Sequence, residues 1–116
     1  MADKQPLIFI EHVLESIKNI SLFTKGISKQ EFFDNKEKNS AVIRQIEIIG
    51  EAVKNLPEEF RKKFKEIPWK DIAGMRDKLM HHYFGVDLNA VWKTVEEDIP
   101  LLEKQLVSIL KEIKKS

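Results

Sequence analysis

The sequence predicts an all-α protein, an antiparallel bundle of four to five helices forming a single domain over residues 1–116. Three observations support this prediction. The chain has 116 residues, a length that suits one domain. It holds only 4 Gly and 4 Pro, too few for a turn-rich fold of many strands. Apolar residues make up 42% of the chain and recur at the three- and four-residue steps of a helix face.

Apolar spacing predicts a first helix over about 7–23, which Gly26 ends. Ser28 and Glu31 have the spacing of a capping box and open a short second helix. The clearest helix carries an apolar stripe from Val42 to Leu56 and ends at Pro57. It contains Gly50, which costs about 1 kcal/mol relative to Ala inside a helix. We therefore expect another helix to approach closely at Gly50.

The second half of the chain begins with a short helix after Pro57, which ends in the basic run 61–65. The pattern then predicts one helix over 69–84, started by Pro68 and stopped by Gly85. Asp87 or Asn89 caps the last helix, whose apolar stripe runs through 91–113. Pro100 lies inside this stripe, so the last helix should kink or break there.

Charge and cysteine content exclude several classes of protein. The chain has 20 Lys+Arg against 19 Asp+Glu, and a net charge of +1 argues against binding nucleic acid by overall charge. The absence of Cys excludes a disulfide scaffold, a thiolate zinc site and a cysteine nucleophile. No apolar run approaches the roughly 18 residues of a membrane span, and no signal-peptide core is present. We therefore expect a soluble, cytoplasmic protein without a membrane partner.

The helix predicted over 69–84 departs from the simple apolar pattern. Arg76 falls in the middle of an arc formed by Ile72, Met75, Leu79, Met80 and Tyr83. An unpaired buried charge is very costly, so Arg76 must pair or face a cleft. Asp77 and His81 are neighbours on a helix, where Asp77 can accept a hydrogen bond from His81. A guanidinium that binds phosphate beside an imidazole that moves a proton suits phosphodiester cleavage.

Structural interpretations of the same residues remain open. Arg76 could pair with Glu47 or Glu51 on the preceding long helix. Trp69 and Trp92 could stack on bases, but their apolar neighbours favour anchors in the core or in a dimer interface. Adjacent histidines diverge on a helix and no His-x3-His pattern is present, so we expect no metal site and no cofactor.

The order Arg76-Asp77-x3-His81-x-Tyr83 resembles the Arg-x4-His-x-Tyr motif of HepT-like toxins, a branch of the HEPN-domain ribonucleases. The resemblance covers about 7–110 and implies a HEPN-like bundle, whose helix order the predicted helices match. It includes four flanking segments: Ile-Gly-Glu-Ala at 49–52, Ile-Pro-Trp at 67–69, Gly-Met-Arg at 74–76, and Val86-Asp87 followed by Val91-Trp92.

The resemblance implies a metal-independent endoribonuclease that acts as the toxin of a toxin–antitoxin pair. It implies a homodimer whose motif helices line a shared cleft. Carried over to this chain, Arg76 would hold the scissile phosphate of the RNA substrate and His81 would act as acid or base. Asp77 would orient the site. His82 is a secondary candidate for RNA contact, and equally an exposed histidine near a helix end.

The implied partner is a minimal nucleotidyltransferase (MNT) antitoxin. In the family this partner neutralises the toxin by AMPylation, the transfer of AMP from ATP to the motif tyrosine, here Tyr83. The chain has one Tyr, so no other tyrosine can be the acceptor. Phosphate added beside Arg76 would occupy the anion site and repel an RNA backbone.

Two other functions are compatible with the residues. In the first, the chain is a non-catalytic nucleotide- or substrate-binding subunit of a nucleotidyltransferase, and Arg76 and Tyr83 contact nucleotide. In the second, it is a dimeric scaffold in which Arg76 forms a structural ion pair. The first predicts that RNA stays intact, and the second that replacing Arg76 only lowers the melting temperature.

Overall fold

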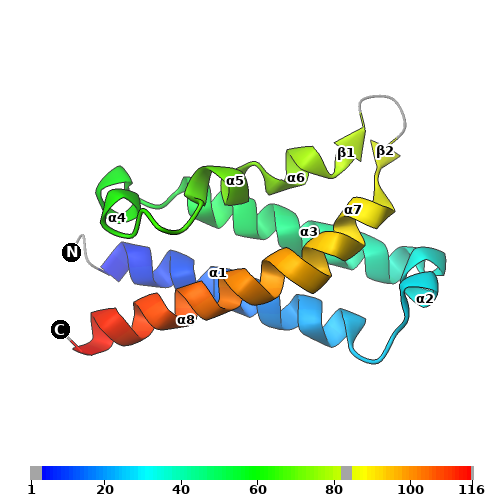
Figure 1. The fold of residues 1–116 in the computed structure, drawn as a ribbon, viewed down its shortest axis with the longest axis horizontal. Helices are drawn as coiled ribbons and strands as arrows, with labels where there is room; N and C mark the ends of the chain where they lie inside the picture. Colours follow the sequence, from blue (N-terminus) through cyan, green and yellow to red (C-terminus); the bar gives the residue numbers. More distant parts are fainter. Residues whose placement is uncertain (1–3, 82–84, 116) are drawn as a thin grey trace.

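The computed structural model describes residues 4–81 and 85–115, and its framework is three long helical rods. Helix α1 (Lys4–Thr24) and helix α3 (Lys36–Lys54) run in opposite directions, and α8 (Ile99–Lys115) packs on α1 (Figure 1). The predicted apolar stripes meet between them. Their buried members are Ile10, Val13, Ile17 and Ile20 on α1, Val42, Ile46, Ile49 and Val53 on α3, and Leu102, Leu106 and Ile109 on α8. The all-α class and the helical bundle are confirmed.

Helix α2 (Lys29–Asp34) begins at the predicted capping box. The Glu31 backbone N–H donates to Ser28 Oγ at 3.1 Å, and the Ser28 backbone N–H donates to Glu31 Oε1 at 3.0 Å. The hydrogen bond from the Ser28 backbone N–H to the carboxylate, followed by the interaction of the carboxylate with the Ser28 side chain, lowers the pKa of Glu31 below its ordinary value. Asn35 then ends α2 and caps α3, since its side chain accepts a hydrogen bond from the Lys38 backbone N–H at 3.0 Å.

The segment between α3 and the last rod folds differently from the prediction. Helix α4 (Glu58–Lys63) follows Pro57 as expected. The single helix expected over 69–84 is wrong. It is replaced by α5 (Trp69–Ala73), a break at Gly74, α6 (Met75–Lys78) and the strand β1 (Met80–His81). Strand β1 pairs antiparallel with β2 (Gly85–Val86), with Met80 opposite Val86 and His81 opposite Gly85.

Hydrogen bonds to a later part of the chain explain why the helix stops. The Asp87 backbone N–H donates to the carbonyl oxygen of Leu79 at 2.7 Å, at the point where α6 ends. Gly85, expected to stop a helix, instead has a φ of +77° within β2. Gly74 is the one residue type in this segment that indicates a break, because glycine destabilises the interior of a helix. The pairing of β1 with β2, however, cannot be predicted from the helical spacing of apolar residues.

The last rod consists of α7 (Leu88–Lys93), the π-helical turn η1 (Thr94–Asp98) and α8. Asp87 caps it, accepting a hydrogen bond from the Ala90 backbone N–H at 3.1 Å. The helix does not break at Pro100, which lies within α8. The π-helical turn η1 directly precedes it, and there the Ile99 N–H bonds to the Thr94 carbonyl five residues back. Proline lacks an N–H and crowds the carbonyl four residues earlier, which disfavours regular α-helix before it. The rod continues past this turn (Figure 1).

Within residues 4–81 and 85–115, the helices are too short or too polar for any of them to cross a membrane.

Candidate active site

The candidate site depends on a close approach between α3 and the end of α5. A Cβ placed on Gly50 would lie 3.1 Å from the carbonyl oxygen of Ala73 and 3.7 Å from that of Ile72. At distances this short, the position on the Gly50 Cα can hold a hydrogen atom but hardly a methyl group. The expected close approach of a second helix at Gly50 is confirmed. It places the start of α6 beside the turn of α3 that carries Glu47.

Arg76 projects from α6 toward α3 and forms an ion pair. Its Nε donates a hydrogen bond to Glu47 Oε2 at 2.5 Å, while the other oxygen of Glu47 lies 3.9 Å from Arg44 Nη1. Of the two partners considered for Arg76, the structure therefore has Glu47. The Arg76 side chain is 47% exposed, so it does not lie buried within an apolar arc as the helical pattern suggested.

The Arg76–Glu47 pair contributes little to stability. Exposed ion pairs are worth roughly 0–1 kcal/mol, because water screens the attraction and both long side chains lose freedom. A half-exposed guanidinium held in one place is, however, well suited to bind an anion that arrives from solvent.

The guanidinium lines a cavity of about 230 Å³ between α3 and the α5–α6 segment. The lining residues comprise three basic and three acidic side chains with a floor of small residues: Arg44, Lys54, Arg76, Glu47, Glu51, Asp77, Gly50 and Ala73. Asp77 Oδ1 is 4.0 Å from Arg76 Nη1, and the Asp77 side chain is 84% exposed. The structure thus brings Arg76 and Asp77 together at the rim of one cavity.

The single helix expected to carry Asp77 and His81 one turn apart is wrong. Helix α6 ends at Lys78, so His81 lies on β1 and not one helical turn above Asp77. The backbone of His81 is held near the end of α6 by the β1–β2 pairing. The side chain of His81, and all of His82 and Tyr83, lie outside the described residues.

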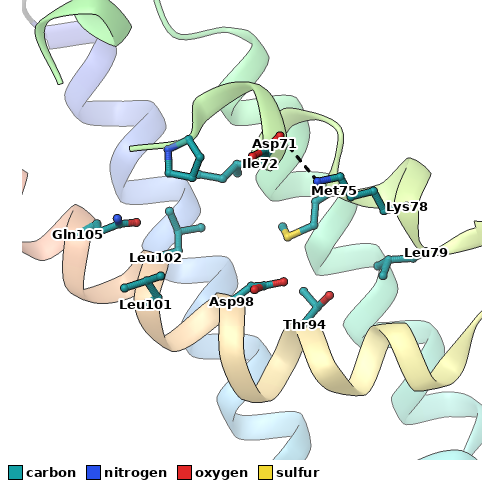
Figure 2. Close-up of a pocket in the computed structure, with 11 residues that line it drawn as sticks. Asp71, Ile72, Met75, Lys78, Leu79, Thr94, Asp98, Leu101, Leu102 and Gln105 are labelled. Carbon is teal, nitrogen blue, oxygen red and sulfur yellow. Dashed lines mark ion pairs between the residues drawn. The ribbon is translucent and has the colours of Figure 1, made fainter. Parts of the chain in front are cut away.

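A second cavity, of about 210 Å³, lies on the other side of the α5–α6 segment (Figure 2). Ile72, Met75 and Leu79 line one wall, and residues of η1 and α8 line the other. Lys78 and Asp71 form an ion pair of 3.7 Å at its edge. This cavity includes neither Arg76 nor Asp77. The short helix α6 therefore presents Met75 and Lys78 to one cavity, and Arg76 and Asp77 to the other.

The two tryptophans pack within the protein. Trp69 is buried, and its indole N–H donates to the carbonyl oxygens of Phe64 at 3.0 Å and Arg61 at 3.2 Å. The ring of half-buried Trp92 lies 5.1 Å from that of Phe32. Both arrangements agree with the interpretation as packing anchors. Among the side chains that the structure describes, which exclude that of His81, no three or more His, Asp or Glu residues cluster as metal ligands would.

Comparison with known proteins identifies the family. A family model described as "Ribonuclease HepT-like" matches residues 13–109. The chain belongs to the HepT-like ribonuclease family. This match spans α3, the α5–α6 segment and the strand carrying His81, which are the elements that build the candidate site.

Individual relatives are similar over almost the whole chain. "Probable ribonuclease HepT" of Thermococcus cleftensis is 48% identical over 103 residues, which are 89% of this chain and 94% of that protein. "Putative RNase TTE0752" of Caldanaerobacter subterraneus subsp. tengcongensis is 49% identical over 111 residues, 96% of this chain and 99% of that protein.

The name of one longer relative includes a second activity. "Gamma-glutamylcyclotransferase and putative RNase MJ0434" of Methanocaldococcus jannaschii is 50% identical over 113 residues, and the chain spans 51% of its length. The HepT-like sequence therefore also occurs as about half of a longer protein. The comparison with solved structures gave no significant match.

Proposed function

We propose that this HepT-like protein is a metal-independent endoribonuclease in which Arg76 binds the scissile phosphate and His81 transfers the proton. The observation that carries the proposal is the position of Arg76. The first residue of the motif is half exposed at a cavity rim, where a phosphate can reach it. The names of the relatives, which call them RNases, support RNA as the substrate.

The chemistry requires one proton acceptor, one proton donor and one cation. The 2′-hydroxyl of the RNA loses its proton to a base and its oxygen attacks the adjacent phosphorus. The bond to the 5′ oxygen breaks, and that oxygen takes a proton from an acid. His81 serves as base or acid, and Arg76 stabilises the negative charge that develops on the phosphate oxygens. Asp77, beside Arg76, orients the site.

Replacing the two motif residues tests the reaction directly. With purified protein, single-stranded RNA and EDTA, we expect Arg76→Ala and His81→Ala each to lower the cleavage rate by about 100-fold or more. Lys78→Ala is the matched control, because it removes a cation from the same helix at the other cavity. Its rate should stay close to that of the wild type.

Two results would contradict the proposal. A folded His81→Ala protein that cleaves RNA at the wild-type rate would exclude the histidine mechanism. A wild-type protein that leaves RNA intact but binds ATP together with a nucleotidyltransferase would instead favour the non-catalytic subunit.

We further propose that the protein is the toxin of a toxin–antitoxin pair and acts as a homodimer with a shared cleft. The support is its membership of the HepT-like family. Expression alone should slow growth, and expression of His81→Ala should not. Light scattering at assay concentration should give twice the mass of one chain; the mass of a single chain would exclude the shared cleft.

Regulation by AMPylation gives a separate prediction for Tyr83. After co-expression with a nucleotidyltransferase antitoxin, intact-mass analysis should show one or more added AMP groups and lost ribonuclease activity. Phosphates attached there would compete with RNA for Arg76. The Tyr83→Phe protein should keep an unmodified mass and stay active with the antitoxin present. A modified Tyr83→Phe protein would place the acceptor elsewhere.

A further inference from the structure

We propose that Glu47 is a positioning residue for Arg76 in the ribonuclease reaction, an inference that rests on the function proposed above. Glu47 lies 29 residues before Arg76 in the chain, on a different helix, and the two side chains share the 2.5 Å hydrogen bond. The motif that runs from Arg76 to Tyr83 does not contain it.

The atom that Glu47 contacts leaves the arginine able to bind phosphate. Glu47 Oε2 accepts its hydrogen bond from Nε, which lies on the side of the planar guanidinium. The terminal edge, formed by Nη1 and Nη2, is a separate pair of donors in the same plane. Two phosphate oxygens can bind that edge while Glu47 stays in place. Glu47 therefore orients the cation without taking the edge that a phosphate needs.

Glu47 is itself held by its surroundings. It lies within the regular helix α3, its side chain is only 28% exposed, and Arg44 lies near its second oxygen. Gly50, three residues on, lets the backbone at Ala73 pack directly on α3. The carboxylate and the helix that bears Arg76 are thus both fixed relative to α3. A long arginine side chain otherwise samples many rotamers, and orienting it before substrate binds favours the reaction.

Two other roles for Glu47 predict different results. If Glu47 only neutralised Arg76 and competed with phosphate, removing it would increase RNA binding and cleavage. If the pair only stabilised the fold, removing it would change the melting temperature and leave cleavage by the folded protein unchanged. The positioning role alone requires an acceptor for the Arg76 Nε–H, whether or not that acceptor is charged.

A series of variants at Glu47 separates these roles. Glu47→Gln keeps an oxygen that can accept from Nε–H, so its kcat should stay within about threefold of the wild type. Glu47→Ala lacks the acceptor, and its kcat should fall about 10- to 100-fold with a smaller change in KM. Glu58→Ala, which removes the acid of the exposed Glu58–Lys62 pair, is the matched control and should cleave normally.

The position of Arg76 can also be measured without activity. In nitrogen-15 NMR spectra, the Nε–H of Arg76 should give a resolved signal with slow hydrogen exchange in the wild type and in Glu47→Gln. That signal should exchange faster and move toward the free-arginine position in Glu47→Ala. If Glu47→Ala does not fold, Glu47→Asp replaces it, because its carboxylate is one methylene shorter and withdraws the acceptor.

The outcomes distinguish this inference from the proposed function. Wild-type cleavage that Arg76→Ala abolishes, together with unchanged or increased cleavage by Glu47→Ala, would overturn the positioning role and leave the ribonuclease intact. Equal losses in Glu47→Gln and Glu47→Ala would also overturn it, because charge and not hydrogen bonding would then matter. A wild-type protein that does not cleave RNA would overturn both, even if the NMR signal confirms the hydrogen bond.

Discussion

At the scale of single residues, the position of Arg76 depends on Gly50. The carbonyl oxygen of Ala73 would lie 3.1 Å from a Cβ at Gly50, so the absence of a side chain there sets the spacing between α3 and the α5–α6 segment. That spacing brings Arg76 within hydrogen-bond distance of Glu47. The cost of glycine inside a helix is therefore offset by a close contact that builds the cavity.

A larger side chain at Gly50 should disturb both the fold and the site. We expect Gly50→Val to lower the free energy of unfolding by about 1–3 kcal/mol, because its methyl groups meet a backbone carbonyl that cannot rotate away. Cleavage should fall as well, since α6 is displaced from Glu47. Chemical denaturation measures the first effect, with Ser40→Val on the exposed face of α3 as the control. Unchanged stability and activity in Gly50→Val would show that the close approach is dispensable.

At the scale of elements, local signals predict where most helices begin. Ser28 with Glu31, Asn35 and Asp87 each cap a helix through a side-chain hydrogen bond. Such signals act within four residues and need no information about the fold. The end of α6 is different, because the Leu79 carbonyl bonds to the Asp87 N–H and Met80 pairs with Val86.

The capping box gives a pH-dependent prediction for α2. Hydrogen bonds to Ser28 lower the pKa of Glu31 below its ordinary value of 4.5. A carboxylate with a lowered pKa stabilises the folded state fully above the unfolded pKa, and this contribution is lost as the pH falls through the folded pKa. We therefore expect Glu31→Gln, which keeps the acceptor but cannot titrate, to lose less stability than wild type on acidification below about pH 5.

Thermal melts of both proteins between neutral pH and mildly acidic pH measure this difference. Glu37→Gln, which removes another carboxylate near the start of a helix, is the control. Parallel acid profiles for wild type and Glu31→Gln would contradict the assignment of this pKa shift to the capping box.

At the scale of the whole molecule, the net charge of +1 first argued against a nucleic-acid partner. The cavity at Arg76 is also nearly neutral, because it is lined by three basic and three acidic residues. In the proposed reaction, recognition of a phosphate there depends on how one guanidinium is oriented, with Glu47 engaging Nε, and not on an excess of positive charge. A nearly neutral protein is therefore compatible with a site for one phosphate group.

The bundle and the family could be predicted from the sequence to a large extent. The stripes on α1, α3 and α8 are buried as their spacing predicts, because helical periodicity is a local property. The prediction failed in the motif segment, where Asp77 and His81 were placed one helical turn apart. Their spacing in the chain is compatible with a helix, but backbone bonds to residues 85–87 end that helix at Lys78.

The sequence by itself determined the helical class and the caps, since each depends on residue types a few positions apart. Only the tertiary structure decided that Glu47, and not Glu51, holds Arg76, and that the motif segment divides into α6 and β1. The physical reason is that both outcomes depend on groups distant in the chain. They are the carboxylate on α3, the backbone contact at Gly50 and the pairing with β2.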